Sequence, residues 1–78
     1  MENQIKLACE ALGWTVRDSK KVSNHPADWY LQIVLAERMS EQGPEYVTWL
    51  YNAEFDSMNS GHYFYGEYNA EQDFKNRR

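Results

Sequence analysis

The residues of this chain whose types could support chemistry are two histidines, one cysteine and several carboxylates. His25 and His62, together with Asp28 or Asp56, carry the donor atoms that zinc and similar ions accept. The sequence has no Cys cluster and no spacing that is typical of a metal centre. We therefore interpret the two histidines as a loop residue and a strand residue, and we expect no metal.

A nucleophilic or acid–base site is the second chemistry that the residue types allow. Cys9 could pair with His62, and Asp18, Glu54 and Asp56 could supply paired carboxylates. Cys9 falls on the apolar side of a predicted helix, where a buried and unreactive thiol is expected, and acids at turns and strand ends are commonly just solvated. We predict no catalytic residue and no cofactor, and we expect a protein that is not an enzyme.

A chain of 78 residues is expected to form a single domain, residues 1–78, whose core is only just large enough to hold it together. Its 42% hydrophobic and 26% charged residues are typical of a folded globular protein. The first residues contain charges and no apolar run long enough for a signal peptide or a membrane span. A single cysteine suits a reducing compartment. We expect a cytoplasmic protein with no membrane partner.

The net charge of −4 conceals a strong separation of charge along the sequence. Between Asp28 and Asp73 the chain has nine acids and one base, Arg38, which gives −8. Residues 1–27 sum to +1 and residues 74–78 to +3. An acid-rich segment repels nucleic-acid backbones and attracts basic partners, within a range that physiological salt limits to about 8 Å.

The first half of the chain predicts a helix, a short strand and a loop. A helix over residues 2–12 is indicated by apolar residues at helical spacing, and Gly13 then stands where a C-cap glycine belongs. Residues 14–18, WTVRD, alternate as a strand does, and the polar residues 19–28 contain Pro26 and read as a loop. The apolar stripe of the helix consists of Ile5, Ala8, Cys9 and Leu12.

Residues 27–40 decide the architecture, and their pattern fits two structures. As a strand they place Trp29, Ile33 and Leu35 on one side, whereas a helix would begin near Pro26 and bring Trp29, Ile33 and Ala36 together. The turn-rich residues 40–45, SEQGPE, are followed by alternating residues 46–55. Two such segments joined by one turn favour a hairpin, and hence the strand.

The last third predicts a second turn, a strand and a helix. Residues 56–61, DSMNSG, have turn composition, and residues 62–68, HYFYGEY, read as an aromatic strand. Asn69 suits the N-cap of a C-terminal helix with Ala70 and Phe74 on its apolar side and Lys75 near its end. The expected fold is α+β, in the order α-β-β-β-β-α, with an antiparallel sheet of three to four strands and one sheet face covered by both helices.

This fold would leave one face of the sheet uncovered. The face beneath Ile5, Cys9, Leu12 and Phe74 is predicted to consist of Val16, Leu31, Ile33, Leu35, Val47, Trp49, Tyr51 and Phe64. The opposite face would carry Tyr30, Val34, Thr48, Leu50, Tyr63 and Tyr65. An uncovered apolar face usually marks a binding surface. The sequence leaves open which of the two faces is the buried one.

The order of helix, strands and helix resembles that of the double-stranded RNA-binding domain. That family relies on lysines at the start of its second helix, where this chain has NAEQD, residues 69–73. Phosphate binding depends on Lys and Arg, and the resemblance therefore implies an RNA-binding fold without the matching charge. We do not expect direct nucleic-acid binding.

A second resemblance covers roughly the C-terminal half. The pattern YVTWLYN, followed by GHYF and a closing DF with basic residues, is similar to small uncharacterised single-domain proteins of bacteria, phages and mobile elements. The resemblance brings no functional residues with it. It implies a role like that of the anti-CRISPR class, in which small acidic proteins often occupy the nucleic-acid-binding surface of a host protein.

The predicted function is a small acidic protein-binding module, in one form an inhibitor that occupies a basic surface of another protein. Two alternatives stay open. One is a structural homo-oligomer, such as a homodimer, that uses the open sheet face, and the other is a nucleic-acid binder like the double-stranded RNA-binding domain. The residues predicted to contact the partner are Tyr30, Leu50, Glu54, Tyr63, Tyr65 and Glu67.

Overall fold

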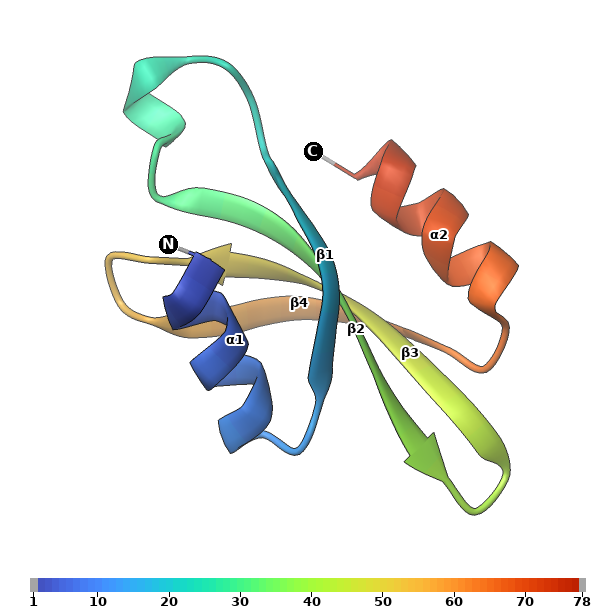
Figure 1. Ribbon diagram of the computed structural model, residues 1–78. Coiled ribbons are helices and arrows are strands. Elements are labelled where there is room, and N and C mark those ends of the chain that lie inside the picture. Colours follow the sequence, from blue (N-terminus) through green and yellow to red (C-terminus); the bar gives the residue numbers. More distant parts are fainter. Residues whose placement is uncertain (1, 78) are drawn as a thin grey trace.

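The computed structural model describes residues 2–77, and it has the predicted order of one helix, four antiparallel strands and a second helix (Figure 1). The strands form one sheet in the order β1-β2-β3-β4. The elements are α1 (Glu2–Ala11), β1 (Thr15–Lys21), the single-turn 3-10 helix η1 (Pro26–Asp28), β2 (Leu31–Ser40), β3 (Gly43–Asn52), β4 (Ser57–Phe64) and α2 (Glu67–Asn76).

The first helix ends where its glycine predicts. Gly13 has a φ of +86°, a left-handed conformation that glycine adopts without strain. The backbone N–H of Trp14 donates to the carbonyl of Cys9 at 2.9 Å, and that of Gly13 donates to Glu10 at 3.0 Å. These two bonds form a Schellman motif, which satisfies carbonyls at the helix end. The motif turns the chain directly into β1.

The ambiguous segment is extended, as the hairpin signal predicted. β2 pairs with β3 without interruption from Leu31 opposite Asn52 to Ser40 opposite Gly43, so the intervening turn has two residues. Gly43 closes that turn with a φ of +110°. The helical alternative survives only as the single turn of η1, which begins at Pro26 before the strand starts.

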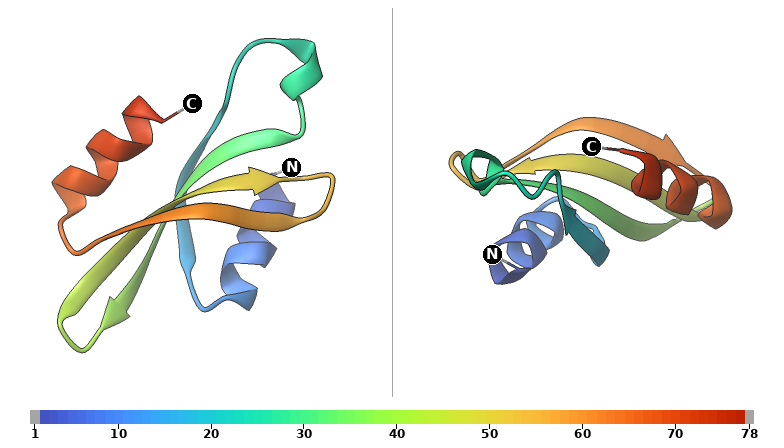
Figure 2. Two further views of the ribbon diagram at one scale, coloured as in Figure 1. Left: turned by 180° about the vertical axis from the view of Figure 1, so that it is seen from behind. Right: turned by 90° about the horizontal axis from the view of Figure 1, so that it is seen from above.

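The two helices cover opposite faces of the sheet, and the prediction of one shared face is wrong. Ile33 and Leu35 pack with Ala70 and Phe74 of α2, in a cluster that also holds Tyr46. The alternate residues of β2, Val34 and Ala36, pack instead with α1, in a cluster with Ile5, Cys9, Trp14, Val47, Trp49 and Tyr51. Figure 2 shows the helices well apart on the twisted sheet. Within residues 2–77, neither face of the sheet is therefore left without a helix.

The face assignments failed because they depended on register between strands. Leu35 lies opposite Thr48, and directly paired residues of neighbouring strands share a face. The prediction had placed Leu35 with Val47 and Trp49, which is one residue out of phase. Val34 and Thr48, expected on an open surface, are fully buried.

Several local predictions need correction. β1 continues to Lys21 instead of ending at Asp18, and the second turn is at residues 53–56, so most of the predicted turn DSMNSG belongs to β4. α2 begins at Glu67 with Gly66 as its N-cap, not at Asn69. Leu12 follows the end of α1 and is 54% exposed. Phe64 is only partly buried, against the cluster beneath α2.

Both edge strands of the sheet are interrupted. The register of β1 shifts between Val16 and Asp18, and that of β3 with β4 shifts around Trp49. At the second shift Ser60 has a φ of +54°, and Gly61 lies so close to Trp49 that a Cβ there would be 2.8 Å from the indole nitrogen. Bulges of this kind disfavour the pairing of an exposed edge with another chain.

Replacement of Trp49 by Ala tests the core beneath α1. Trp49 is 5% exposed and packs edge-on against Trp14, with ring centroids 5.4 Å apart. The loss of this buried ring should lower the free energy of unfolding by about 3 to 5 kcal/mol, measured by urea unfolding followed by circular dichroism. Phe55→Ala, which removes an exposed ring, should unfold at nearly the parent's urea midpoint. Equal midpoints for the two variants would contradict this core assignment.

Candidate functional site

The β1–β2 connection, residues 22–30, is tightly ordered by its own hydrogen bonds. The hydroxyl of Ser23 donates to Asp28 and accepts from the backbone N–H of His25 at 3.1 Å. The Nδ1 atom of His25 accepts from the backbone N–H of Ala27 at 3.1 Å, which caps η1. His25 therefore acts as a turn residue that fixes the position of the following Trp29.

The β3–β4 turn, residues 53–56, is ordered in a similar way. The side-chain oxygen of Asn52 accepts from the backbone N–H groups of Glu54 at 2.9 Å and Phe55 at 3.3 Å. The hydroxyl of Tyr51, which is fully buried, donates to Asp56. Burial, this hydrogen bond and the charge of Asp56 together raise the pKa of Tyr51 to about 12, so the phenol stays protonated.

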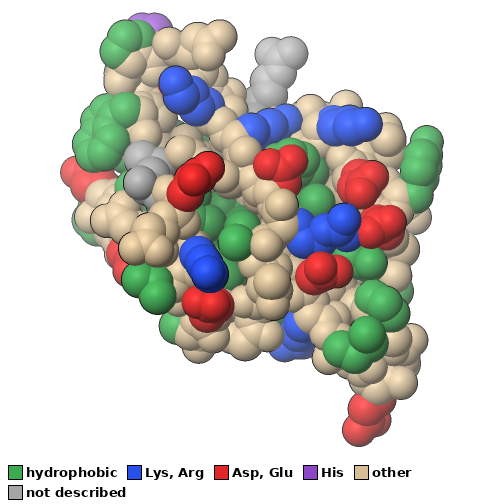
Figure 3. Space-filling model, in the orientation of Figure 1, with side chains coloured by type: hydrophobic (Ala, Val, Ile, Leu, Met, Phe, Trp, Pro, Cys, Tyr) green, Lys and Arg blue, Asp and Glu red, His purple; other side chains and the backbone are tan. Residues whose placement is uncertain are grey.

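These two connections lie side by side at one end of the sheet. The backbone N–H of Ala53 joins them by donating to the carbonyl of Tyr30 at 2.8 Å. They present Trp29, 64% exposed, and Phe55, 75% exposed. Figure 3 shows hydrophobic side chains at the surface over the β1–β2 connection, at the upper left, with an acidic side chain beside them. We call the residues Trp29, Tyr30, Glu54 and Phe55 the loop surface.

The two connections that carry the loop surface have an excess of negative charge. Residues 22–30 and 53–56 contain Asp28, Glu54 and Asp56 but no Lys or Arg, and the nearest cation along the chain is Lys21. Asp28 and Asp56 accept hydrogen bonds from neutral hydroxyls, which leaves their charges in place. Within residues 2–77 the side chain of Glu54 has neither a hydrogen bond nor an ion pair.

A second group of exposed aromatics lies where β4 leads into α2. Tyr63, Tyr65 and Tyr68 are 57%, 61% and 72% exposed, and we call them the tyrosine segment. Two acids near this segment, Glu67 and Glu37, form ion pairs with Arg17. They therefore have a cation beside them, which the acids in the loops of the loop surface lack within those loops.

The six residues predicted to bind a partner do not form one surface. Tyr30 and Glu54 belong to the loop surface, whereas Tyr63, Tyr65 and Glu67 lie at or beside the tyrosine segment. Leu50 is partly buried against the cluster beneath α2. β4 runs from Ser57 beside the β3–β4 turn to Phe64 beside the tyrosine segment, so its length separates the two groups.

Sequence reasoning missed Trp29, Phe55 and Tyr68 as surface residues. Trp29 and Phe55 had been counted as strand residues by extending the alternation into the loops. A signal was present for both, since Trp29 follows the turn-forming residues NHPAD and Phe55 follows Asn52 by the spacing of a side-chain-capped turn.

The residues considered for catalysis are separated. Cys9 is buried on the side of α1 that faces the sheet. His62 pairs with Thr48 on the opposite face, beneath α2, so the two residues cannot act together. Burial, helped by the charge of Glu10, raises the pKa of the Cys9 thiol to about 11, as expected for an unreactive cysteine. Asp18 accepts a hydrogen bond from the backbone N–H of Ser19. Among residues 2–77, no group of three or more His, Cys, Asp or Glu could hold a metal ion.

His62 instead joins a polar network that fastens α2 to the sheet. Its Nδ1 atom is 3.0 Å from the carboxylate of Asp73, which also accepts from the buried hydroxyl of Thr48. Arg77 donates to the carbonyl of Thr48 at 2.8 Å and to its hydroxyl at 3.0 Å. Burial alone would raise the pKa of Asp73, but the hydrogen bonds from Thr48 and His62 and the charges of His62 and Arg77 outweigh it and lower the pKa.

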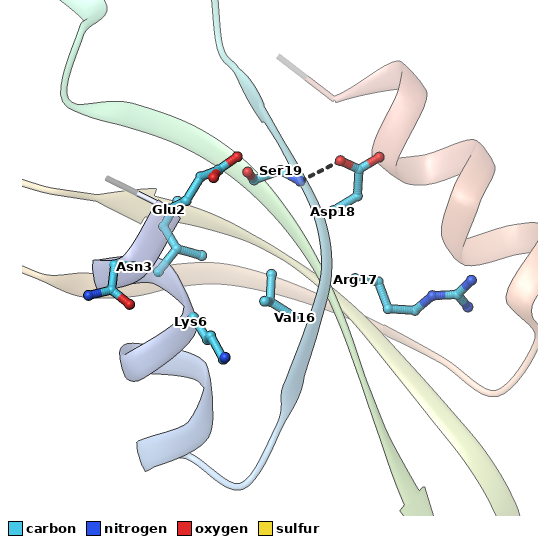
Figure 4. A pocket seen from close by; sticks show the side chains of 8 residues that line it. Glu2, Asn3, Lys6, Val16, Arg17, Asp18 and Ser19 are labelled. Carbon is cyan, nitrogen blue, oxygen red and sulfur yellow. Dashed lines mark hydrogen bonds between the residues drawn. The ribbon is translucent and has the colours of Figure 1, made fainter.

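A groove of about 450 Å³ runs between α1 and β1. Figure 4 shows Glu2, Asn3 and Lys6 lining it from the helix, and Arg17 lining it from β1 with the end of its side chain extended toward α2. Its rim thus mixes side chains of opposite charge on one helix face. Such an arrangement lacks the convergent polar groups that are typical of a ligand pocket.

The chain matches no protein-family model, no curated protein and no solved structure with which it was compared. None of the helices within residues 2–77 is long and apolar enough to cross a membrane.

The lowered pKa of Asp73 predicts an acid-sensitive contribution to stability. Because the folded-state pKa lies below the ordinary value of 3.8, Asp73 stabilises the fold above that pH, and this contribution is lost as the pH falls through the folded-state pKa. Asp73→Asn should reduce the free energy of unfolding by about 1 to 2 kcal/mol at pH 7. The difference between parent and variant should shrink when both are unfolded in urea at acid pH. A difference that does not change with pH would contradict this role.

Proposed function

We propose that this chain is a protein-binding module whose loop surface contacts a basic surface of another protein. The observation that carries this proposal is the exposure of Trp29 and Phe55 on two hydrogen-bonded loops that contain three acids and no Lys or Arg. Large aromatic side chains with charged surroundings are the usual anchors of a protein interface.

The order of the loops supports binding energetically. Association normally loses free energy when flexible side chains and loops become fixed. Here Trp29 follows a capped turn, and Phe55 donates its backbone N–H to Asn52, so both rings are presented by backbone that is already held. Less ordering is then needed when a partner binds.

The charge of the two connections that carry the loop surface supports a basic partner. Three acids without a neighbouring ion pair repel acidic surfaces and accelerate encounters with basic ones. Basic protein surfaces commonly bind nucleic acid, and occupation of such a surface would make this chain an inhibitor. The interrupted edge strands and the covered sheet faces leave side chains, and not strand pairing, as the means of contact.

Substitutions in the loop surface test the proposal against a partner recovered from host lysate and then purified. Trp29→Ala should weaken binding by about 2 kcal/mol, roughly 30-fold, mainly through a faster off-rate. Glu54→Lys should mainly slow the on-rate, and the affinity of the parent should fall as salt is raised. Surface plasmon resonance measures both rates.

Two matched controls separate the loop surface from the rest of the molecule. Glu67→Lys changes the net charge as Glu54→Lys does, but beside the tyrosine segment, and Tyr65→Ala removes an exposed aromatic there. Both should bind nearly as the parent does. Loss of binding in these controls alone would assign the interface to the tyrosine segment. Direct binding of RNA or DNA that Glu54→Lys strengthens, with no protein partner recovered, would overturn the proposal.

A further inference from the structure

Among residues 2–77, Arg17, Lys20 and Arg38 each lie over an aromatic ring of the same chain. The guanidinium of Arg38 lies 4.3 Å from the ring centroid of Trp14, that of Arg17 lies 5.8 Å from Tyr46, and the ammonium of Lys20 lies 5.3 Å from Phe74. A cation above an aromatic face is attracted by the ring's negative face, most strongly for tryptophan. The fold therefore uses this interaction repeatedly to stabilise its own surface.

Trp29 is the exception among the three tryptophans. Trp49 is buried and Trp14 has Arg38 above it, whereas within residues 2–77 no Lys or Arg lies over the Trp29 ring. Trp29 meets Tyr30 at an interplanar angle of 71°, with centroids 5.8 Å apart. The two rings thus form a corner, and the tryptophan remains 64% exposed beside it.

The two loops beside this corner carry negative charges, which attract a cation. Asp28 directly precedes Trp29, and the loop bearing Glu54 is joined to Tyr30 through the backbone N–H of Ala53. Neither loop contains a Lys or Arg that could occupy the ring. Resting on the proposed function, we infer that the loop surface receives an arginine side chain of the partner, which stacks on Trp29 and faces the carboxylate of Glu54.

Arginine fits this corner better than lysine for a geometric reason. The guanidinium is planar, so it can lie flat on the indole while its N–H groups, which point outward in the same plane, donate to a carboxylate at the side. The ammonium of lysine is a strongly hydrated point charge and does not stack in this way. A uniform acidic field would attract both residues equally, so a preference for arginine is the specific consequence of the inference.

The test uses two unstructured Gly-Ser peptides of equal length and equal charge, one with arginines and one with lysines at the same positions. Each is titrated at low salt into the ¹⁵N-labelled protein, and the indole N–H signals of Trp14, Trp29 and Trp49 are followed by NMR. The arginine peptide should bind roughly two- to fivefold tighter than the lysine peptide and should shift mainly the Trp29 signal. The Trp29→Phe variant should keep part of this preference, and Trp29→Ala should lose it.

The other outcomes would overturn the inference, and they show whether the proposed function fails with it. Equal affinity for the two peptides, or binding that leaves the Trp29 signal in place, would show attraction by the acidic field alone, and the proposed function would stand. Binding of neither peptide would count against both proposals. Glu54→Gln should lower the affinity of the protein for both peptides. If this substitution lowers the affinity for the lysine peptide more than that for the arginine peptide, the result would also count against the stacked arrangement.

Discussion

The register between β2 and β3 is the constraint on which the other features of this structure depend. A two-residue turn closes the hairpin between Ser40 and Gly43, and ten consecutive pairs follow from it. Because side chains alternate across a strand, this register determines which face receives each residue of the two central strands. The buried run from Ile33 to Ala36 is then divided, with alternate residues beneath α2 and α1. Both helices are needed to cover one hairpin.

The second helix is held by polar contacts as much as by apolar ones. Only Ala70 and Phe74 are buried in α2, while Asp73 bonds to Thr48 and Lys20 donates to the carbonyl of Lys75 at 2.8 Å. Buried hydroxyls and carbonyls require partners, and α2 supplies them to the centre of β3. Residues whose types suggested chemistry, such as His62, are thereby used to fasten the fold.

The same contacts decide where charge remains available to a partner. Three of the acids in the acid-rich segment, namely Glu37, Glu45 and Glu67, lie in ion pairs with Arg17 or Arg38 that the fold creates, and Asp73 contacts His62 and Thr48. The acids of the two connections at the other end have no cation beside them in the same loops. Within residues 2–77, part of the negative charge of the acid-rich segment therefore remains without an ion pair beside Trp29 and Phe55.

The sequence by itself determined the elements and their order, because their signals are local. The apolar spacing with Gly13 predicted α1 and its end, and alternation on either side of a turn predicted the hairpin. It could not determine which faces are buried, since a shift of one residue in register exchanges them. Nor could it show that Arg17 pairs with Glu67, fifty positions away, or that the connections carrying Trp29 and Phe55 lie side by side at one end of the sheet. These facts depend on distances between segments remote in the chain, and only the packed tertiary structure specifies such distances.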